Sequence, residues 1–333
     1  MVRVSLAILA MLALLSCCAE SSSVTGPTES PEPATVSGPQ PVTGATAAVT
    51  GPQPVTVATV PATPVAVPPD GPYLAQTPPG SSPVRFAPSI VRGDLHSSPV
   101  FTPDGREVYW ALQGAVIMTS RVEGGAWTQP RRLELSPTMT DYRDPCLSPS
   151  GDRLFFLSKG TIPGSSLPEK ENIWYVDRVG SGWGEPRPVD QTVNRFQLHW
   201  QVSVNDRGYL YFTSADPGDE NIYVSRYVDG RYVEPERLGS AINSAEFYET
   251  APFIAPDGRY LLFSRLDMAD SSRIKLYISY ADDDGAWGQP TMLDNVGYGI
   301  CAVVSPDGKY LFFLSSSKGV SWMNTGFIDQ DNE

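Results

Sequence analysis

A turn that recurs about every 50 residues constrains the fold of this chain more than any other feature. In each copy a short apolar run precedes the turn and a second apolar run follows it, which is the pattern of a β-hairpin. The turns read Pro-Asp-Gly or a variant of it, and their glycines are Gly105, Gly151, Gly208, Gly258 and Gly308. Proline presets φ at the first corner, aspartate can bond the following amides, and glycine accepts a positive φ. We therefore interpret Asp104, Asp257 and Asp307 as turn-forming residues.

Each repeat contains more than the hairpin. A third apolar run follows, as in residues 173–176, then an aromatic residue and a proline, as in Trp183 and Pro186, and then a short fourth strand. Four short strands per repeat are the content of one propeller blade. Because a single blade cannot bury both of its faces, blades have to pack side by side around an axis. We predict an all-β fold with five blades.

The two ends of the repeat region predict how the ring closes. The fifth unit ends with the strand at residues 322–328 and lacks a fourth strand, whereas residues 83–88, before the first unit, resemble the fourth strand at residues 235–238. We expect this N-terminal segment to complete the last blade, which removes a free sheet edge.

The repeats in residues 83–329 resemble those of the TolB-like, WD-like (Pro-Asp-Gly type) β-propeller proteins, which occur among exported bacterial proteins. The resemblance rests on turn and core residues, so it implies a fold and says little about function. TolB carries six blades, whereas this sequence has five turn glycines. Five blades is therefore our prediction, and six is the alternative.

The first residues have the pattern of an export signal. Arg3 precedes an apolar stretch at residues 6–15, which is too short to cross ~30 Å of hydrocarbon. The sequence Leu14-Leu15-Ser16-Cys17 then resembles the bacterial lipobox, which implies cleavage after residue 16 and a lipid on Cys17. The alternative is an ordinary cleaved signal that leaves Cys17 and Cys18 as reactive thiols. By resemblance to lipoprotein sorting, Cys18 after the lipidated residue favours the outer membrane of a Gram-negative host.

A Pro-, Thr- and Val-rich segment follows, in which residues 36–43 return almost unchanged as residues 49–56. Proline removes backbone donors and favours extended conformations, and no hydrophobic period is present to bury a face. We predict a signal peptide at residues 1–16, a disordered linker at residues 17–82 and the propeller at residues 83–333. The lipid on Cys17 would then attach the propeller to the membrane.

Charge and cysteine positions narrow the possible partners and bonds. The formal net charge is −13 and no cluster of lysine and arginine stands out, so we predict no nucleic-acid partner. Cys146 and Cys301 fall on the innermost strands of units two and five, which are not neighbours in a ring of five. We therefore expect no disulfide between them.

A candidate site follows from the topology, because the segments that lead into the innermost strands converge on the axis. Both histidines of the chain lie there, nine residues before Gly105 and Gly208 respectively. Aromatic and charged residues gather at the same place in the other units, and the concave face of a ring is a usual ligand site. The predicted ligand-binding residues are His96, Tyr142, Arg143, His199, Trp200, Tyr248, Glu249 and Tyr298.

Three interpretations of these residues stay open. They could fill the funnel and bond to neighbouring blades, or they could bind a sugar or peptide through aromatic faces and directional hydrogen bonds. They could also include the two carboxylates of a glycosidase, drawn from Asp94, Asp144 and Glu249. His96, His199 and Glu249 are of residue types that can bind a metal, but no motif supports such a site. We therefore predict neither a metal nor a cofactor.

The sequence contains no nucleophile elbow, phosphate loop or zinc motif, which favours binding over catalysis. We therefore predict an exported, lipid-anchored propeller that acts as a binding or scaffold module, with an envelope protein or a glycan as its partner. The alternative is a carbohydrate-active enzyme with its site on the funnel face.

Overall fold

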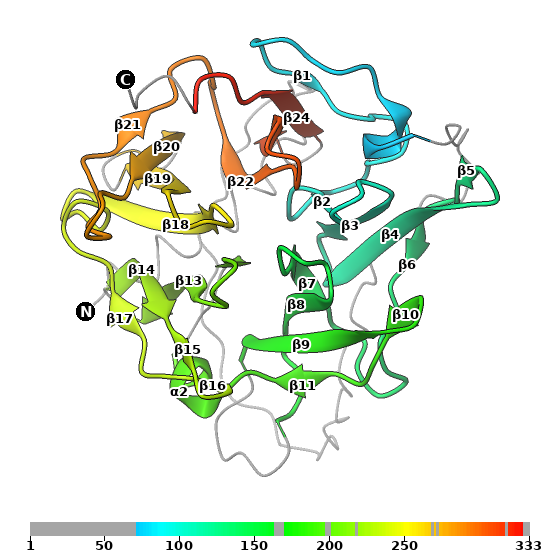
Figure 1. The fold of residues 1–333 in the computed structure, drawn as a ribbon, viewed down its shortest axis with the longest axis horizontal. Helices are drawn as coiled ribbons and strands as arrows, with labels where there is room; N and C mark the ends of the chain where they lie inside the picture. Colours follow the sequence, from blue (N-terminus) through cyan, green and yellow to red (C-terminus); the bar gives the residue numbers. More distant parts are fainter. Residues whose placement is uncertain are drawn as a thin grey trace, which may run out of the picture.

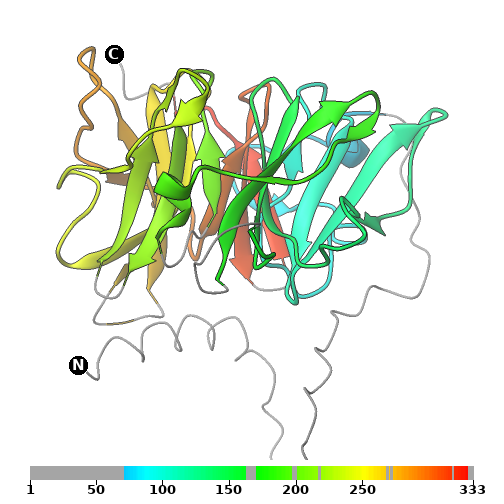
Figure 2. The same cartoon turned by 90° about the horizontal axis from the view of Figure 1, so that it is seen from below.

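The computed structural model describes residues 71–162, 170–196, 201–216, 219–267, 270, 273–316 and 319–328. Within them, five antiparallel sheets of four or five strands form the blades, and one short hairpin accompanies the third blade. Figure 1 shows the sheets set around a central axis, and Figure 2 shows the strands running between the two faces of the ring. The prediction of an all-β, five-bladed propeller is confirmed, and the described residues form no sixth blade.

In the first four blades the strands follow the chain from the axis outwards. The first blade contains β2 (Val100–Phe101), β3 (Glu107–Leu112), β4 (Val116–Glu123), β5 (Ala126–Trp127) and β6 (Arg131–Arg132). The second contains β7 (Arg143–Leu147), β8 (Arg153–Ser158), β9 (Asn172–Val179), β10 (Gly182–Trp183) and β11 (Arg187–Pro188), followed by the short helix α2 (Gln191–Asn194).

The third blade contains β12 (Val202–Val204), β13 (Leu210–Asp216), β14 (Asp219–Ser225) and β17 (Glu236–Arg237), with β15 (Tyr227–Val228) and β16 (Arg231–Tyr232) as its extra hairpin. The fourth contains β18 (Phe247–Ile254), β19 (Tyr260–Asp267), β20 (Ile274–Tyr280) and β21 (Thr291–Met292). The fifth contains β22 (Ile300–Val304), β23 (Tyr310–Ser316) and β24 (Gly319–Asn324).

The N-terminal strand closes the ring as predicted. Strand β1 (Val84–Arg85) pairs antiparallel with β24, with Val84 opposite Trp322, and becomes the outermost strand of the fifth blade. The next residue, Phe86, is 1% exposed and its ring packs edge-on against Phe312 and Trp322. The last blade is therefore fastened to the start of the domain by both backbone pairing and aromatic packing.

The packed part of the chain begins earlier than predicted. Residues 71–82, which we assigned to the linker, lie against the ring, where Leu74 is completely buried and Tyr73 packs edge-on against Phe101 and Tyr310. The backbone N–H of Tyr73 donates to the Gly105 carbonyl of the first turn, at 3.0 Å. The boundary at residue 83 was wrong because an isolated Tyr-Leu pair carries no periodic signal in the sequence.

The hydrophobic core lies between the blades. The buried apolar residues form five clusters, and each cluster lies mainly between two neighbouring blades. Strand β3 shows the cause, since Val108, Trp110 and Leu112 face the fifth blade while Tyr109 and Ala111 face the second. A strand that is buried on both faces needs a continuous apolar run, which is the pattern that flanks each turn in the sequence.

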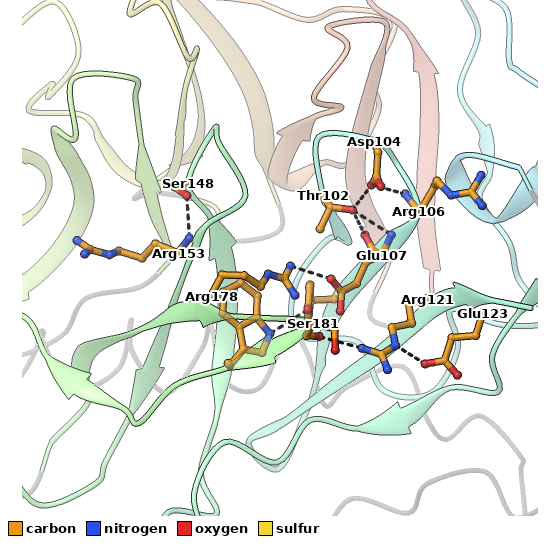
Figure 3. A network of polar contacts seen from close by, with 12 residues as sticks. Thr102, Asp104, Arg106, Glu107, Arg121, Glu123, Ser148, Arg153, Arg178 and Ser181 are labelled. Atoms are coloured by element: carbon orange, nitrogen blue, oxygen red, sulfur yellow. Dashed lines mark hydrogen bonds and ion pairs between the residues drawn. The ribbon is translucent and has the colours of Figure 1, made fainter.

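Polar contacts reinforce the junction between the first two blades near the turns (Figure 3). Arg178 of β9 donates to Glu107 of β3 at 2.8 Å, and its guanidinium lies 3.9 Å from the ring centroid of Trp183. Trp183 Nε1 in turn donates to the Tyr109 hydroxyl at 3.0 Å. Within the first turn, Asp104 accepts from the Arg106 amide at 3.0 Å, as the turn pattern predicted.

Candidate functional site

The innermost strands share a backbone feature that we did not predict. The residue seven positions before the turn glycine adopts a left-handed conformation in four blades, and these residues are Asp144, Gln201, Ala251 and Cys301, with φ of 43°, 36°, 54° and 57°. Three of the strands, β7, β18 and β22, also show a shift of pairing register at this place. Such a bulge turns a side chain out of the regular alternation of the strand. No glycine marks the position, so only the folded backbone reveals it.

Asp144 uses this position to bond across a blade boundary. Its carboxylate Oδ1 lies 2.7 Å from Nδ1 of His96, which belongs to the first blade. The side chain of Asp144 is 5% exposed and that of His96 is 28% exposed. Burial by itself lowers the pKa of His96, but the attraction and hydrogen bond of the Asp144 carboxylate outweigh it and hold the pKa above its ordinary value of 6.5.

Two more charged residues complete this group. Arg143 Nη1 lies 3.1 Å from Glu171 Oε1, and Arg143 Nε donates to Asp141 Oδ1 at 2.9 Å. Burial raises the pKa of the Glu171 carboxyl, while the Arg143 guanidinium opposes that shift. His96, Arg143, Asp144 and Glu171 interact electrostatically with one another, and we call them the strand-start cluster.

Two of the predicted ligand-binding residues, Tyr142 and Glu249, are buried in the protein. Tyr142 is 4% exposed, packs edge-on against Phe156, and its hydroxyl donates to the Met139 carbonyl. Glu249 is completely buried, and its Oε1 accepts from Ser244 Oγ at 2.8 Å and from Arg265 Nε at 3.1 Å.

Glu249 thus supports its own blade. Arg265, opposite it on β19, also donates to two backbone carbonyls of the segment that leads into the blade. Burial raises the pKa of the Glu249 carboxyl, which the hydrogen bonds from Ser244 and the Arg265 guanidinium oppose. The expectation of an accessible carboxylate at this position does not agree with its burial.

The remaining predicted residues differ in how far they are exposed to solvent. Asp94 and Tyr298 are exposed, Tyr298 by 40%, and Tyr248 is half-buried on β18. His199 and Trp200 lie outside the described residues, so the second histidine of the prediction has no position here. The structure therefore brings together His96, Arg143 and Asp144 of the predicted set and adds Glu171, which no sequence pattern had singled out.

The other half of the central channel holds a cavity. Its volume is about 330 Å³, and residues from all five innermost strands and from the Pro-Asp-Gly-type turns line it. Its walls are mainly apolar, and none of the strand-start cluster belongs to its lining. We call it the turn-end cavity.

Cys146, in the wall of that cavity, and Cys301 are both buried and free. Burial raises the pKa of the Cys146 thiol to about 12. In the part of the chain that the structure describes, no group of three or more His, Cys, Asp and Glu residues is arranged to hold a metal ion. No helix within the same residues combines the length and the apolar character needed to cross a membrane.

Comparison with known proteins adds one relationship. The sequence is 25% identical over 244 residues to the Tol-Pal system protein TolB of Francisella tularensis subsp. mediasiatica, an alignment that covers 71% of this chain and 50% of that protein. The chain is a TolB-like β-propeller. It spans about half the length of the curated relatives that it matches, and no protein-family model matches its sequence.

Two solved structures align with part of this chain. TolB from Acinetobacter baumannii gives a TM-score of 0.44 at 14% identity, covering 70% of this chain and 54% of that chain. An endo-arabinase from Bacteroides thetaiotaomicron gives a TM-score of 0.46 at 18% identity, covering 74% and 96%.

Proposed function

We propose that this protein is a binding module of the bacterial cell envelope. In this proposal it is exported, a lipid on Cys17 holds it to the membrane, and the propeller receives an envelope protein at the strand-start cluster. The observation that carries the proposal is the cluster itself, because charges of both signs from two blades meet there and one of them, His96, remains partly exposed.

The cluster departs from the repeat, which is why it supports a function. Residues that recur in every unit form turns and core, as the Asp104 turn and the β3 side chains do. The pairing of His96 with Asp144 spans the first and second blades, and the residue that corresponds to Asp144 is Ala251 in the fourth blade. A group of mixed charge suits the complementary, directional contacts that set partner choice in protein interfaces.

The similarity to TolB supports the envelope setting. The matched relatives are Tol-Pal system proteins, and the match covers 71% of this chain. We extend to this chain only the coarser inference, an envelope protein as its partner, and keep a glycan as the alternative occupant of the same surface.

The glycosidase alternative finds less support. It requires two carboxylates at an open pocket, roughly 5–10 Å apart. Of the three acids that we considered, Glu249 is completely buried against Arg265 and Asp144 is held by His96 with 5% of its side chain exposed. No arrangement among the described residues specifically favours catalysis, so we do not propose it.

Cross-linking in living cells tests the partner. The full-length chain would carry a photoreactive residue at Asp94 or Tyr298, which are exposed in the segments that lead into the innermost strands, or at Val179, which is 65% exposed at the end of β9. We expect a discrete envelope protein to cross-link from the first two positions and not from Val179. The Arg143→Gln substitution removes the positive charge but keeps a side chain that can donate hydrogen bonds to Asp141 and Glu171, so it should abolish the cross-link without lowering the melting temperature by more than a few degrees. Equal cross-linking from all three positions would contradict the proposal.

A glycan arm and an anchoring arm complete the test. Calorimetric titration of the same protein with cell-wall glycans should show no binding heat that is lost in the Arg143 variant. If such heat were observed, a glycan rather than a protein would be the ligand of the strand-start cluster. Metabolic labelling with an alkyne fatty acid should mark the wild type and the Cys18→Ser variant equally. Cys17→Ser should remove the label, and persistence of the label would refute lipidation at that residue.

A further inference from the structure

The segment that precedes the first strand is docked on the propeller like a bound peptide. Residues 71–75 lie at the junction between the fifth and first blades, where Figure 1 shows the start of the described chain in blue. Leu74 is completely buried and Tyr73 is 6% exposed, although neither residue lies on a strand. The chain joins a sheet only at Val84, in β1. These two side chains therefore enter the junction from outside the blades, as the side chains of a ligand would.

Side chains from both blades contact Tyr73. Its ring packs edge-on against Phe101 of the first blade and Tyr310 of the fifth, with centroids 5.0 and 5.4 Å away. Its hydroxyl donates a hydrogen bond to the carboxylate of Asp307, in the turn of the fifth blade. The junction thus recognises both the apolar ring and the polar end of a tyrosine.

Backbone groups of the segment are recognised as well. The N–H of Tyr73 donates to the Gly105 carbonyl at 3.0 Å, and Nε1 of Trp127 donates to the Gly71 carbonyl at 2.9 Å. Trp127 is 2% exposed, so its indole is held in place by the surrounding core. The groups that contact the segment form what we call the seam site: Phe101, Gly105, Trp127, Asp307 and Tyr310.

The backbone of the docked segment is strained. Tyr73, Leu74 and Ala75 adopt positive φ values of 51°, 55° and 49° and form one left-handed turn, η1 (Tyr73–Ala75). This conformation is unfavourable for L-residues, and consecutive residues rarely adopt it because each one adds its own cost. Glycine would adopt it without that cost, but none of the three is glycine. The contacts of the segment with the seam site are therefore partly offset by its own backbone.

We propose that residues 71–75 are a displaceable internal ligand, and that the seam site binds a tyrosine–leucine segment of a partner polypeptide. Such a segment carries the same side chains and backbone groups, and glycine after its leucine would let it form the turn with less strain. The chain's own segment has a high effective concentration, because residues 76–83 connect it directly to β1. A partner binds only when it displaces this segment, so the docked state is an autoinhibitory contact.

The seam site is separate from the strand-start cluster. Gly105 lies beyond the end of β2, whereas His96 precedes the start of the same strand. A partner at the seam site can therefore bind whether or not an envelope protein occupies the strand-start cluster.

Opposite substitutions at one exposed residue test the competition. The full-length chain in detergent would be titrated with fluorescein-Gly-Pro-Tyr-Leu-Gly-Gln-amide, followed by fluorescence polarisation. Ala75→Val adds a β-branched side chain at a positive φ, so it should release the segment and tighten peptide binding about tenfold. Ala75→Gly removes strain from the docked segment and should weaken peptide binding about fivefold.

The outcomes of this titration are distinct. Equal affinities of the two Ala75 variants, or no binding to Ala75→Val, would overturn the proposal. The control peptide fluorescein-Gly-Pro-Ser-Ser-Gly-Gln-amide should bind neither variant, because it lacks the tyrosine and the leucine. Equal binding of both peptides would show that the seam site does not recognise these side chains and would also overturn the proposal.

Loss of one hydrogen bond locates the peptide. In the Ala75→Val background, Trp127→Phe removes the indole N–H that contacts the Gly71 carbonyl and should weaken peptide binding about fivefold. The matched control is Trp183→Phe, whose lost N–H donates to Tyr109 at the junction of the first two blades, and it should keep the affinity. Equal affinities of the two tryptophan variants would overturn the assignment to the seam site.

A second pair of variants serves if Trp127→Phe does not fold. A Cβ at Gly105 would lie 3.0 Å from Cβ of Pro72, so Gly105→Ala should weaken binding of the peptide proline at the same place. Gly308→Ala has a similar positive φ and nothing within 4 Å of its Cβ, so it should leave peptide binding unchanged. Equal effects of the two substitutions would again overturn the assignment.

Discussion

His96 and Glu249 occupy the same place in their repeats, nine residues before a turn glycine, yet their surroundings differ. His96 bonds across a blade boundary to Asp144 and keeps 28% of its side chain exposed. Glu249 pairs inside its own blade with Arg265 and is completely buried. The repeat fixes where the backbone runs, and the neighbouring elements decide whether a side chain there is accessible or structural.

The largest expected effect concerns the buried pair. Glu249→Ala should lower the free energy of unfolding by about 3–5 kcal/mol, because it leaves the Arg265 guanidinium buried without its carboxylate. Urea unfolding followed by tryptophan fluorescence measures the change. Glu249→Gln is the matched control and should cost less, since its carbonyl can still accept from Ser244 and Arg265. A stable Glu249→Ala protein that had lost partner binding would return Glu249 to the site.

The junction between the first and second blades holds His96 and Asp144 at one end and the turn at Gly151 at the other. A substitution at Gly151 should loosen this junction. A Cβ at Gly151, where φ is +74°, would lie 2.5 Å from Cδ of Pro103 in the first blade. Gly151→Ala should therefore cost about 3 kcal/mol, from backbone strain and from displacement of the proline. Gly308→Ala has a similar φ of +73° and nothing within 4 Å, so strain alone should cost about 1–2 kcal/mol. Equal losses of unfolding free energy in the two variants would show that the contact with Pro103 adds no cost to the backbone strain at Gly151.

A pH-dependent effect is expected at the strand-start cluster. The folded pKa of His96 lies above its unfolded value of 6.5, so its contribution to stability is complete below that value and disappears as pH rises through the folded pKa. Asp144→Asn removes the carboxylate and keeps a side chain that tolerates the positive φ. The stability gap between wild type and variant should be about 1 kcal/mol wider at pH 6 than at pH 8.5.

Nuclear magnetic resonance titration checks the same pair directly. The chain has two histidines, so the His96 signals can be assigned by comparison with a His96→Gln variant. The pKa of His96 should fall in Asp144→Asn, with Glu171 still raising it and Arg143 still lowering it. An unchanged pKa would mean that Asp144 does not control the charge of this histidine.

The smallest effect is expected at an exposed residue of the predicted site. Tyr298 is 40% exposed, and Tyr298→Ser should change the free energy of unfolding by no more than about 0.5 kcal/mol. Partner affinity should fall if the interface extends from the strand-start cluster to the fifth blade. A large loss of stability would place Tyr298 with Glu249 among the structural residues.

The repeat made most of the fold predictable. Turn residues such as Asp104 act locally, and the alternation in β3 is readable because successive side chains of a strand face opposite junctions. The closure by β1 was also predictable, because one missing strand at the end of the last unit matched one extra strand at the start. The packing of Tyr73 and Leu74 was not predicted, because they contact residues that are distant in the chain and belong to no repeating sequence pattern.

The candidate site was predictable only in outline. The sequence placed His96, Arg143, Asp144 and Glu249 near the starts of the innermost strands, but it could not tell which of them meet. Glu171 was missed because it lies beside β9, far along the chain from Arg143, and carries no motif. The contact of Gln201 with Ala302 was not predictable either, because it joins residues of two separate blades.

The sequence by itself determined the number of blades, the chemistry of the turns and the strand that closes the ring, because these depend on local propensity and on patterns that repeat. The tertiary structure alone decided that Asp144 reaches His96, that Glu249 is buried by Arg265, and that Gln201 of the third blade bonds to Ala302 of the fifth. Those contacts join residues that are distant in the chain, and their geometry exists only once the blades have packed around the axis.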